Sequence, residues 1–235
     1  MGMMKRAVGA AFPRTLPILT GYLFLGIAFG LLLSSKGYSW GIAFLMSVCI
    51  YAGSMQFVAV GLLASPLNLG AAVLLTLMVN ARHLFYGLSM LDRFRDTGKW
   101  KGYLIFALTD ETYSLLCTVP VPSDIPKGTF YGAIALLDHL YWVTGSVLGA
   151  LFGSLLSFQL EGIDFVMTAL FVVLFLEQWE KSPNHTPALT GIFVTLFFLL
   201  LVGSQWFLIP SMGGILLVLT VLRSRLEVKY HALSH

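Results

Sequence analysis

Long apolar stretches without any charged residue dominate the chain. No Asp, Glu, Lys or Arg lies between Lys36 and Arg82, and none lies between Lys181 and Arg223. Each interval could hold two helices of about 20 residues, the length that crosses the hydrocarbon core of a bilayer. We therefore expect an all-α fold, a polytopic integral membrane helical bundle with seven or eight membrane segments. The predicted segments are 16–34, 40–64, 67–91, 102–119, 129–157, 164–179, 188–203 and 207–222.

Composition supports this fold class. Apolar residues make up 57% of the 235 residues and charged residues 11%, against about 25% charged in soluble domains. The short connections leave no room for a soluble domain, so residues 1–235 are predicted to form a single transmembrane domain. The net charge of +3 does not indicate a nucleic-acid partner, because the basic residues bracket apolar segments and act as topology signals.

The segment at 40–64 carries helix-breaking residues at its middle, Ala52-Gly53-Ser54. Basic residues near the N-terminus and in the loop at 93–101 predict that both lie in the cytoplasm. An even number of crossings must then separate them, although three apolar segments intervene. We expect segment 40–64 to enter the membrane and return, because glycine and serine can break a helix where protein or water covers the backbone. A continuous helix and eight full crossings remain the alternative.

Two parts of the chain resemble each other weakly. The small residues around Gly26 and Gly30 are matched by those around Gly149 and Gly153, at spacings that allow helices to approach closely. This similarity predicts repeat halves at 16–119 and 129–222. If segment 40–64 and its counterpart at 164–179 both fail to cross, segment 16–34 runs outward and segment 129–157 runs inward, which is an inverted repeat of the kind used by secondary transporters. Chance similarity between apolar segments is the alternative.

Charged residues inside the predicted spans mark a candidate site. Arg82 lies in segment 67–91, and Asp110 and Glu111 lie in the next span. A charge near the bilayer centre costs roughly 2.5–3.5 kcal/mol on insertion scales and usually faces the bundle interior. Arg82 and Asp110 lie at equal distances along the chain from Asp96, so antiparallel helices would place them at similar depth. The pair is either structural or also binds substrate or carries a proton.

Two further groups of polar residues lie in apolar segments. Asp138 and His139 could relay protons, although adjacent residues on a helix cannot both face one site, and one of them could instead cap the bundle. At the break in segment 40–64, exposed amide groups of a half-helix would favour an anion such as a carboxylate. The polar side chains at this break are Tyr51, Ser54 and Gln56.

Three motifs are similar to those of a known family. GSMQF at 53–57, NARHLFYGLS at 80–89 and TDETYSL at 109–115 resemble, in order and spacing, the AzlC family of branched-chain amino acid permeases. The resemblance implies export of branched-chain amino acids across the inner membrane of a bacterial cell. It also implies a small, separately encoded membrane subunit of the AzlD type as partner.

Together these features predict a secondary transporter that exports valine, leucine and isoleucine, with methionine as a further candidate. The sequence has no ATP-binding, metal-binding or enzyme motif, so we expect proton coupling and no cofactor. A channel or facilitator, and a non-transporting membrane subunit, are the alternatives. The predicted substrate-binding residues are Tyr51, Ser54, Gln56, Asn80 and Arg82. The predicted residues for ion pairing or proton coupling are Arg82, Asp110, Glu111, Asp138 and His139.

Overall fold

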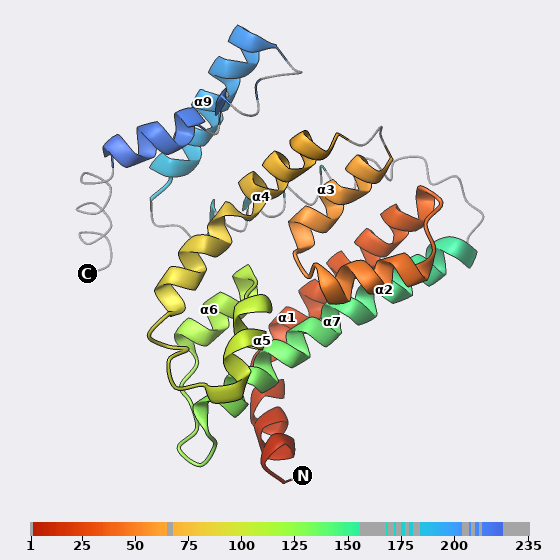
Figure 1. The fold of residues 1–235 in the computed structure, drawn as a ribbon, viewed down its shortest axis with the longest axis vertical. Coiled ribbons are helices and arrows are strands. Elements are labelled where there is room, and N and C mark those ends of the chain that lie inside the picture. Colours follow the sequence, from red (N-terminus) through yellow and green to blue (C-terminus); the bar gives the residue numbers. More distant parts are fainter. Residues whose placement is uncertain are drawn as a thin grey trace. The chain divides into compact units, whose positions relative to one another are not determined.

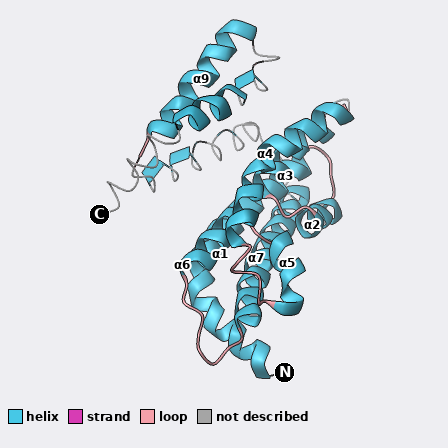
Figure 2. Cartoon of the chain, turned by 60° about the vertical axis from the view of Figure 1, so that its left-hand side comes forward, coloured by secondary structure: helices cyan, strands magenta, loops and turns pink. Residues whose placement is uncertain are grey.

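The computed structural model describes two compact units, Met1–Met167 and Thr168–His235, and all regular structure in the described residues is helical (Figures 1 and 2). The described residues are 2–64, 68–155, 168, 172, 175–176, 179–180, 184–203, 207, 210–211 and 213–222.

Two long helices, α1 (Gly2–Ser35) and α7 (Lys127–Leu155), form the centre of the first unit. Both are long and apolar enough to cross a membrane. Helix α1 begins well before the predicted segment 16–34, because Ala7, Ala11 and Thr15 recur every four residues and bury one face of its first half.

Glycines allow α1 and α7 to touch along their backbones. A Cβ atom on Gly26 would lie 2.9 Å from the backbone nitrogen of Ser146, and one on Gly145 would lie 2.9 Å from the carbonyl oxygen of Leu23. Added Cβ atoms on Gly30 and Gly149 would also overlap backbone atoms of the facing helix. The predicted role of these glycines in close helix approach is therefore confirmed.

Helices α1 and α7 run parallel to each other (Figure 1). Arg6 at the start of α1 pairs with Asp124 just before α7, whereas Gly153 near the end of α7 packs on Ser34 near the end of α1. The prediction that segment 129–157 runs opposite to segment 16–34 is wrong. Small residues permit close approach in either relative direction, so their similarity carries no information on orientation.

Segment 40–64 forms two antiparallel helices, α2 (Trp40–Cys49) and α3 (Gly53–Leu63). Gln56 Nε2 donates to Ser47 Oγ near the break, and Tyr38 Oη donates to the carbonyl oxygen of Leu63 at the far ends. The segment thus turns back on itself at the predicted break. Tyr51 adopts the left-handed conformation there, with φ 43°, which is strained for a residue with a side chain.

Segment 102–119, expected as one span, is also two helices. After α4 (Leu69–Met90) and the 3₁₀ turn η1 (Gly98–Trp100), α5 (Lys101–Phe106) ends and α6 (Asp110–Thr118) begins. The single-span prediction is wrong because Thr109 starts a new helix by accepting a hydrogen bond from the Thr112 amide, and acidic residues fill its first turn.

Side-chain contacts show that α5 and α6 are antiparallel. Helix α5 runs in the same direction as α7. Trp100, just before α5, packs on Gly132, and Tyr103 is hydrogen-bonded to His139 farther along both helices. Helix α6 instead runs in the same direction as α4. The Tyr113 hydroxyl accepts a hydrogen bond from Ser89, and farther along, the Leu116 carbonyl oxygen accepts one from Arg93, just beyond the end of α4. In Figure 1, α4 runs in the opposite direction to α1 and α7, so α6, which is parallel to α4, is antiparallel to α5.

In the second unit, α9 (Thr186–Val202) corresponds to the predicted segment 188–203 and ends at Gly203, whose φ is 80°. Of the predicted segment 207–222, the part at Gly213–Leu222 is an apolar helix. Most of the predicted segment 164–179 lies outside the described residues.

Candidate functional site

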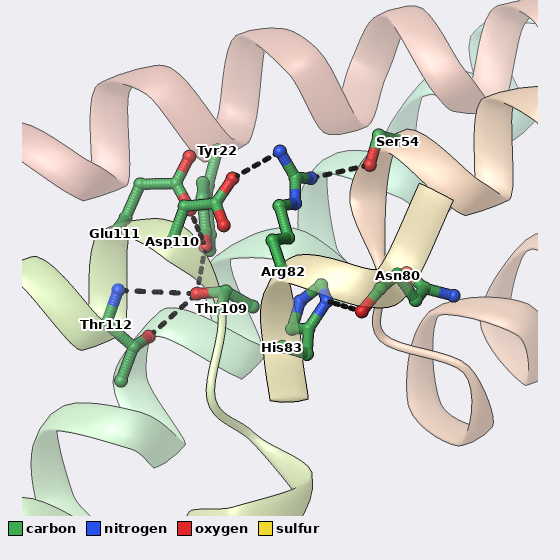
Figure 3. Close-up of polar contacts among 9 residues, drawn as sticks. All are labelled: Tyr22, Ser54, Asn80, Arg82, His83, Thr109, Asp110, Glu111 and Thr112. Atoms are coloured by element: carbon green, nitrogen blue, oxygen red, sulfur yellow. Dashed lines mark hydrogen bonds and ion pairs between the residues drawn. The ribbon is translucent and has the colours of Figure 1, made fainter. Parts of the chain in front are cut away.

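Arg82 of α4 connects the starts of α3 and α6 (Figure 3). Its Nη1 atom lies 2.9 Å from Asp110 Oδ2, and its Nη2 atom donates to Ser54 Oγ at 2.7 Å. Ser54 belongs to the first turn of α3, and Asp110 is the first residue of α6. The ion pair that the spacing of Arg82 and Asp110 predicts is therefore present, and its role in transport stays a prediction.

The ion pair is partly accessible and not fully satisfied. The side chains of Arg82 and Asp110 are 39% and 23% exposed. Among the described residues, Arg82 Nε and Asp110 Oδ1 are buried without a hydrogen-bonding partner. No side chain caps the start of α3, where the residue before the helix is Ala52, so backbone amide groups add positive potential beside Arg82. This arrangement can bind one positive and one negative group.

A second network links Glu111 to Asp138 across three helices. Tyr22 Oη, on α1, donates to Glu111 Oε2 at 2.7 Å and lies 2.6 Å from Thr109 Oγ1. Thr109 Oγ1 lies 3.0 Å from Thr112 Oγ1, which donates to Asp138 Oδ2 on α7 at 2.8 Å. Figure 3 shows the part around Tyr22, Thr109 and Thr112. The network places Glu111 beside Asp110 and Asp138 deep among the helices.

His139 faces a different set of residues from its neighbour Asp138. Its Nε2 atom lies 3.1 Å from the carbonyl oxygen of Ser47, and its Nδ1 atom lies 3.0 Å from Tyr103 Oη. Because a carbonyl oxygen can only accept, neutral His139 carries its proton on Nε2. Its ring stacks on Tyr51 at 4.1 Å between centroids. His139 thus holds the broken end of α2 against α5, and the predicted divergence of the two adjacent side chains is confirmed.

Gln56 lies apart from Arg82, in a buried packing network. Its side chain is 0% exposed, donates to Ser47 Oγ at 3.2 Å and accepts from Trp142 Nε1 at 2.8 Å. The Trp142 ring packs against Tyr22 and Phe29. Both ends of the Gln56 amide are therefore occupied by protein groups, and the structure does not bring this predicted substrate-binding residue to the ion pair.

Asn80 and His83 point away from the ion pair. Figure 3 shows the Asn80 amide extending away from the Arg82 guanidinium group. His83 Nδ1 lies 3.3 Å from the carbonyl oxygen of Asn80 in its own helix, and the His83 ring meets the edge of Tyr86. Among the described residues, Asn80 Oδ1 is buried without a hydrogen-bonding partner. The predicted substrate contact of Asn80 thus lacks a link to Arg82.

Sequence reasoning missed three hydroxyl groups of the second network. Thr109 and Thr112 could have been found from the helix-start pattern Thr109-Asp110-Glu111-Thr112, in which a threonine precedes two acidic residues. Tyr22 carries no such signal, because a tyrosine in an apolar helix commonly serves as a packing residue or an interfacial anchor.

Opposed charges and buried carboxyl groups among apolar helices define a polar centre of the kind that membrane transport proteins keep. The family model described as AzlC protein matches residues 17–156, which include this whole centre. The chain belongs to the AzlC family, which is a family of transport proteins and not of enzymes.

Relatives extend the match over most of the chain. The chain is 53% identical over 221 residues to the branched-chain amino acid transport protein AzlC of Bacillus subtilis, covering 94% of this chain and 87% of the relative. It is 42% identical to an uncharacterized membrane protein of Haemophilus influenzae, covering 98% and 95%. It is 31% identical to the inner membrane protein YgaZ of Escherichia coli, covering 78% and 79%. No solved structure matches the chain.

Proposed function

We propose that this protein is a proton-coupled secondary transporter that exports valine, leucine and isoleucine from the bacterial cytoplasm, with methionine as a further candidate substrate. It is a multi-pass protein of the inner membrane, with its N-terminus in the cytoplasm. The observation that carries the proposal is the Arg82–Asp110 ion pair held between the starts of two half-helices. The similarity to a Bacillus subtilis protein named for branched-chain amino acid transport supports the substrate class.

The polar centre has the groups that an amino acid requires. Arg82, with the first amide groups of α3 and the Ser54 hydroxyl beside it, suits the substrate carboxylate. Asp110 suits the substrate ammonium group, since its Oδ1 atom is buried without a partner among the described residues. Substrate binding then exchanges the internal ion pair for two intermolecular ones. The empty and loaded centres have equal net charge, because the zwitterion is neutral.

Two features of the chain support coupling to protons. No ATP-binding motif occurs in the sequence, so an ion gradient is the economical energy source. Carboxyl groups at Glu111 and Asp138 can take up and release protons within the bundle. The family resemblance supports the export direction and a small AzlD-type subunit as partner, which should co-purify with the full chain.

Charge-neutralising variants test the substrate site. We expect Arg82→Gln, Asp110→Asn and the double variant all to lose efflux of labelled leucine from preloaded cells at equal membrane levels. A purely structural pair predicts a different result, because removing both charges leaves neither uncompensated, so the double variant would recover efflux. The exposed pair Arg6–Asp124 provides the matched control, since Arg6→Gln with Asp124→Asn should leave efflux unchanged.

Transport mode is tested separately in proteoliposomes. A transporter should give counterflow of labelled leucine and accumulation against a leucine gradient when a pH gradient is imposed. A channel or facilitator gives neither. A non-transporting subunit would show no leucine flux with or without the small partner, while still co-purifying with it.

A further inference from the structure

We infer that Tyr22, Thr109 and Thr112 form a proton relay between Glu111, beside the substrate site, and the buried Asp138. This inference rests on the proposed proton-coupled transport and names the route that the proton takes. The four links run from Glu111 to Tyr22, Thr109, Thr112 and Asp138, with oxygen–oxygen distances of 2.7, 2.6, 3.0 and 2.8 Å. All four fall within the range of O–H···O hydrogen bonds.

The number of protons shared by the four hydrogen-bonded links determines how the relay can move a proton. Three hydroxyl groups supply three protons for four links, so one link lacks a proton when both carboxyl groups are ionised. One added proton supplies the missing one, so that all four links are hydrogen bonds. Located on Glu111, it orients every hydroxyl group to donate toward Asp138; located on Asp138, it orients every hydroxyl group to donate toward Glu111. The two arrangements have the same number of hydrogen bonds.

Transfer between the two arrangements moves one proton without moving any heavy atom far. Protonated Glu111 gives its proton to Tyr22 Oη, Tyr22 gives its own to Thr109, Thr109 to Thr112, and Thr112 to the Asp138 carboxylate. Each hydroxyl oxygen loses one O–H bond as it gains another, while Glu111 loses one O–H bond and becomes a carboxylate and Asp138 gains one and becomes neutral, so charge and atoms balance. Thr109 Oγ1 can also keep the bond from the Thr112 amide, because a hydroxyl oxygen accepts two hydrogen bonds.

Burial makes the two ends of the relay unequal. Tyr22, Thr109 and Thr112 are all buried, and Asp138 is 0% exposed. Within the described residues, Asp138 accepts its one hydrogen bond from Thr112, and its Oδ1 atom has no partner. Glu111 is less buried and adjoins Asp110 of the ion pair. Asp138 therefore exchanges protons with the substrate site through the hydroxyl groups, and Glu111 is the point of entry.

The relay also explains why a proton and a substrate would move together. Glu111 follows Asp110 in the first turn of α6, and Thr109 is the residue that caps this helix. A shift of α6 as Asp110 changes partner from Arg82 to the substrate ammonium group would lengthen or shorten the links at Thr109 and Glu111. Substrate occupancy and proton transfer thus share one short helix.

Tyr22→Phe and Thr112→Val test the relay, because each removes one hydroxyl group and keeps the side-chain shape. Phe at position 22 retains the ring that packs on the edge of Trp142. Tyr38→Phe and Thr118→Val are matched controls, since each loses hydrogen bonds to backbone carbonyl oxygens outside the relay. Thr112→Ser restores the hydroxyl group and serves as the rescue variant.

The full chain, with any membrane subunit that co-purifies, is reconstituted in liposomes that contain a pH-sensitive dye. Labelled leucine exchange at equal pH and leucine-driven proton movement are measured for each variant. We expect Tyr22→Phe and Thr112→Val to keep exchange and to lose proton movement, the controls to keep both, and Thr112→Ser to regain proton movement. The double variant should be no worse than either single one, because both interrupt one path.

Four results would overturn the relay, and they are distinguishable. Unchanged proton movement in both single variants means that protons take another route. Parallel loss of exchange and proton movement, with no rescue by Thr112→Ser, means that the hydroxyl groups only maintain the fold. Exchange without proton movement in the unmodified protein would refute the relay but leave the proposed substrate site standing. Absence of any exchange would refute the proposed function as well.

Discussion

Ser54 and Gln56 are two residues apart at the start of α3, and their side chains enter different networks. Ser54 Oγ accepts a hydrogen bond from Arg82, which is partly exposed. Gln56 is fully buried between Ser47 and Trp142. The first network has unsatisfied groups that a substrate can use, and the second is complete without one. A polar residue in a membrane segment therefore serves transport or packing according to whether its partners are already supplied.

Substitutions at these two positions should separate stability from transport. Gln56→Leu leaves the Trp142 donor and the Ser47 acceptor without their partner, so we expect a loss of about 1–3 kcal/mol of stability, measured as a lower melting temperature in detergent. The folded fraction should keep the KM of the unmodified protein for leucine. Ser54→Ala should raise KM or abolish transport with little change in melting temperature. A raised KM in Gln56→Leu at normal stability would return Gln56 to the substrate site.

At the scale of elements, the close contact between α1 and α7 forms the centre of the first unit. Glycines on both helices let the backbones meet, and Tyr22 and Asp138 project from these two helices toward α6. Because helix α6 spans only Asp110–Thr118, its position depends on these neighbours and on Arg93, which donates to the Leu116 carbonyl oxygen at its end. Close packing of the long helices therefore controls the geometry of the short one.

Adding a single methyl group where α1 and α7 touch should destabilise the fold. An Ala at Gly30 or Gly149 would push its Cβ atom into the backbone of the facing helix, so we expect each variant to lose roughly 2 kcal/mol or more. Thermal unfolding in detergent measures the effect. Gly21→Ala is the matched control, because nothing lies within 4 Å of a Cβ atom there. Equal melting temperatures for Gly21→Ala and Gly149→Ala would contradict close packing at this crossing.

At the scale of the molecule, the first unit contains two similar assemblies of opposite direction. Helix α1 is followed by the antiparallel pair α2 and α3, and α4 is followed by the antiparallel pair α5 and α6. Since α1 and α4 run in opposite directions, the two pairs enter from opposite ends of the unit, and their breaks meet where Tyr51 faces Phe106. We propose that these pairs are re-entrant in the membrane and that α1 and α4 cross it.

Cysteine labelling of intact cells tests this topology. In a background with Cys49 and Cys117 replaced by serine, single cysteines are placed at the exposed positions Ser39, Ala64 and Lys99. We expect an impermeant reagent outside the cell to label positions 39 and 64, at the two ends of the α2–α3 pair, and to miss position 99. Cysteine at Ser123, beyond the second pair, should behave like position 99. Opposite labelling of positions 39 and 64 would mean that this segment crosses.

The sequence predicted much of this picture because its signals are local or nearly so. Uncharged intervals gave the helical class, Gly53 and Ser54 gave the break after α2, and equal spacing about Asp96 gave the pairing of Arg82 with Asp110. A hairpin relates positions close in the chain, so counting residues is sufficient to align them. The helix start at Thr109 was also readable from local residues, although the apolar pattern around it predicted one span.

Only the tertiary structure decided the relations between distant helices. The parallel course of α1 and α7, the burial of Gln56 against Trp142 and the chain of hydroxyl groups from Glu111 to Asp138 each join residues that are far apart in sequence. Apolar segments and small residues indicate that helices pack together. They do not indicate which helices are neighbours or in which direction each one runs, because many arrangements bury the same groups. The sequence by itself determined that this is a helical membrane protein and that Arg82 pairs with Asp110. Three-dimensional packing decided which polar groups surround this ion pair.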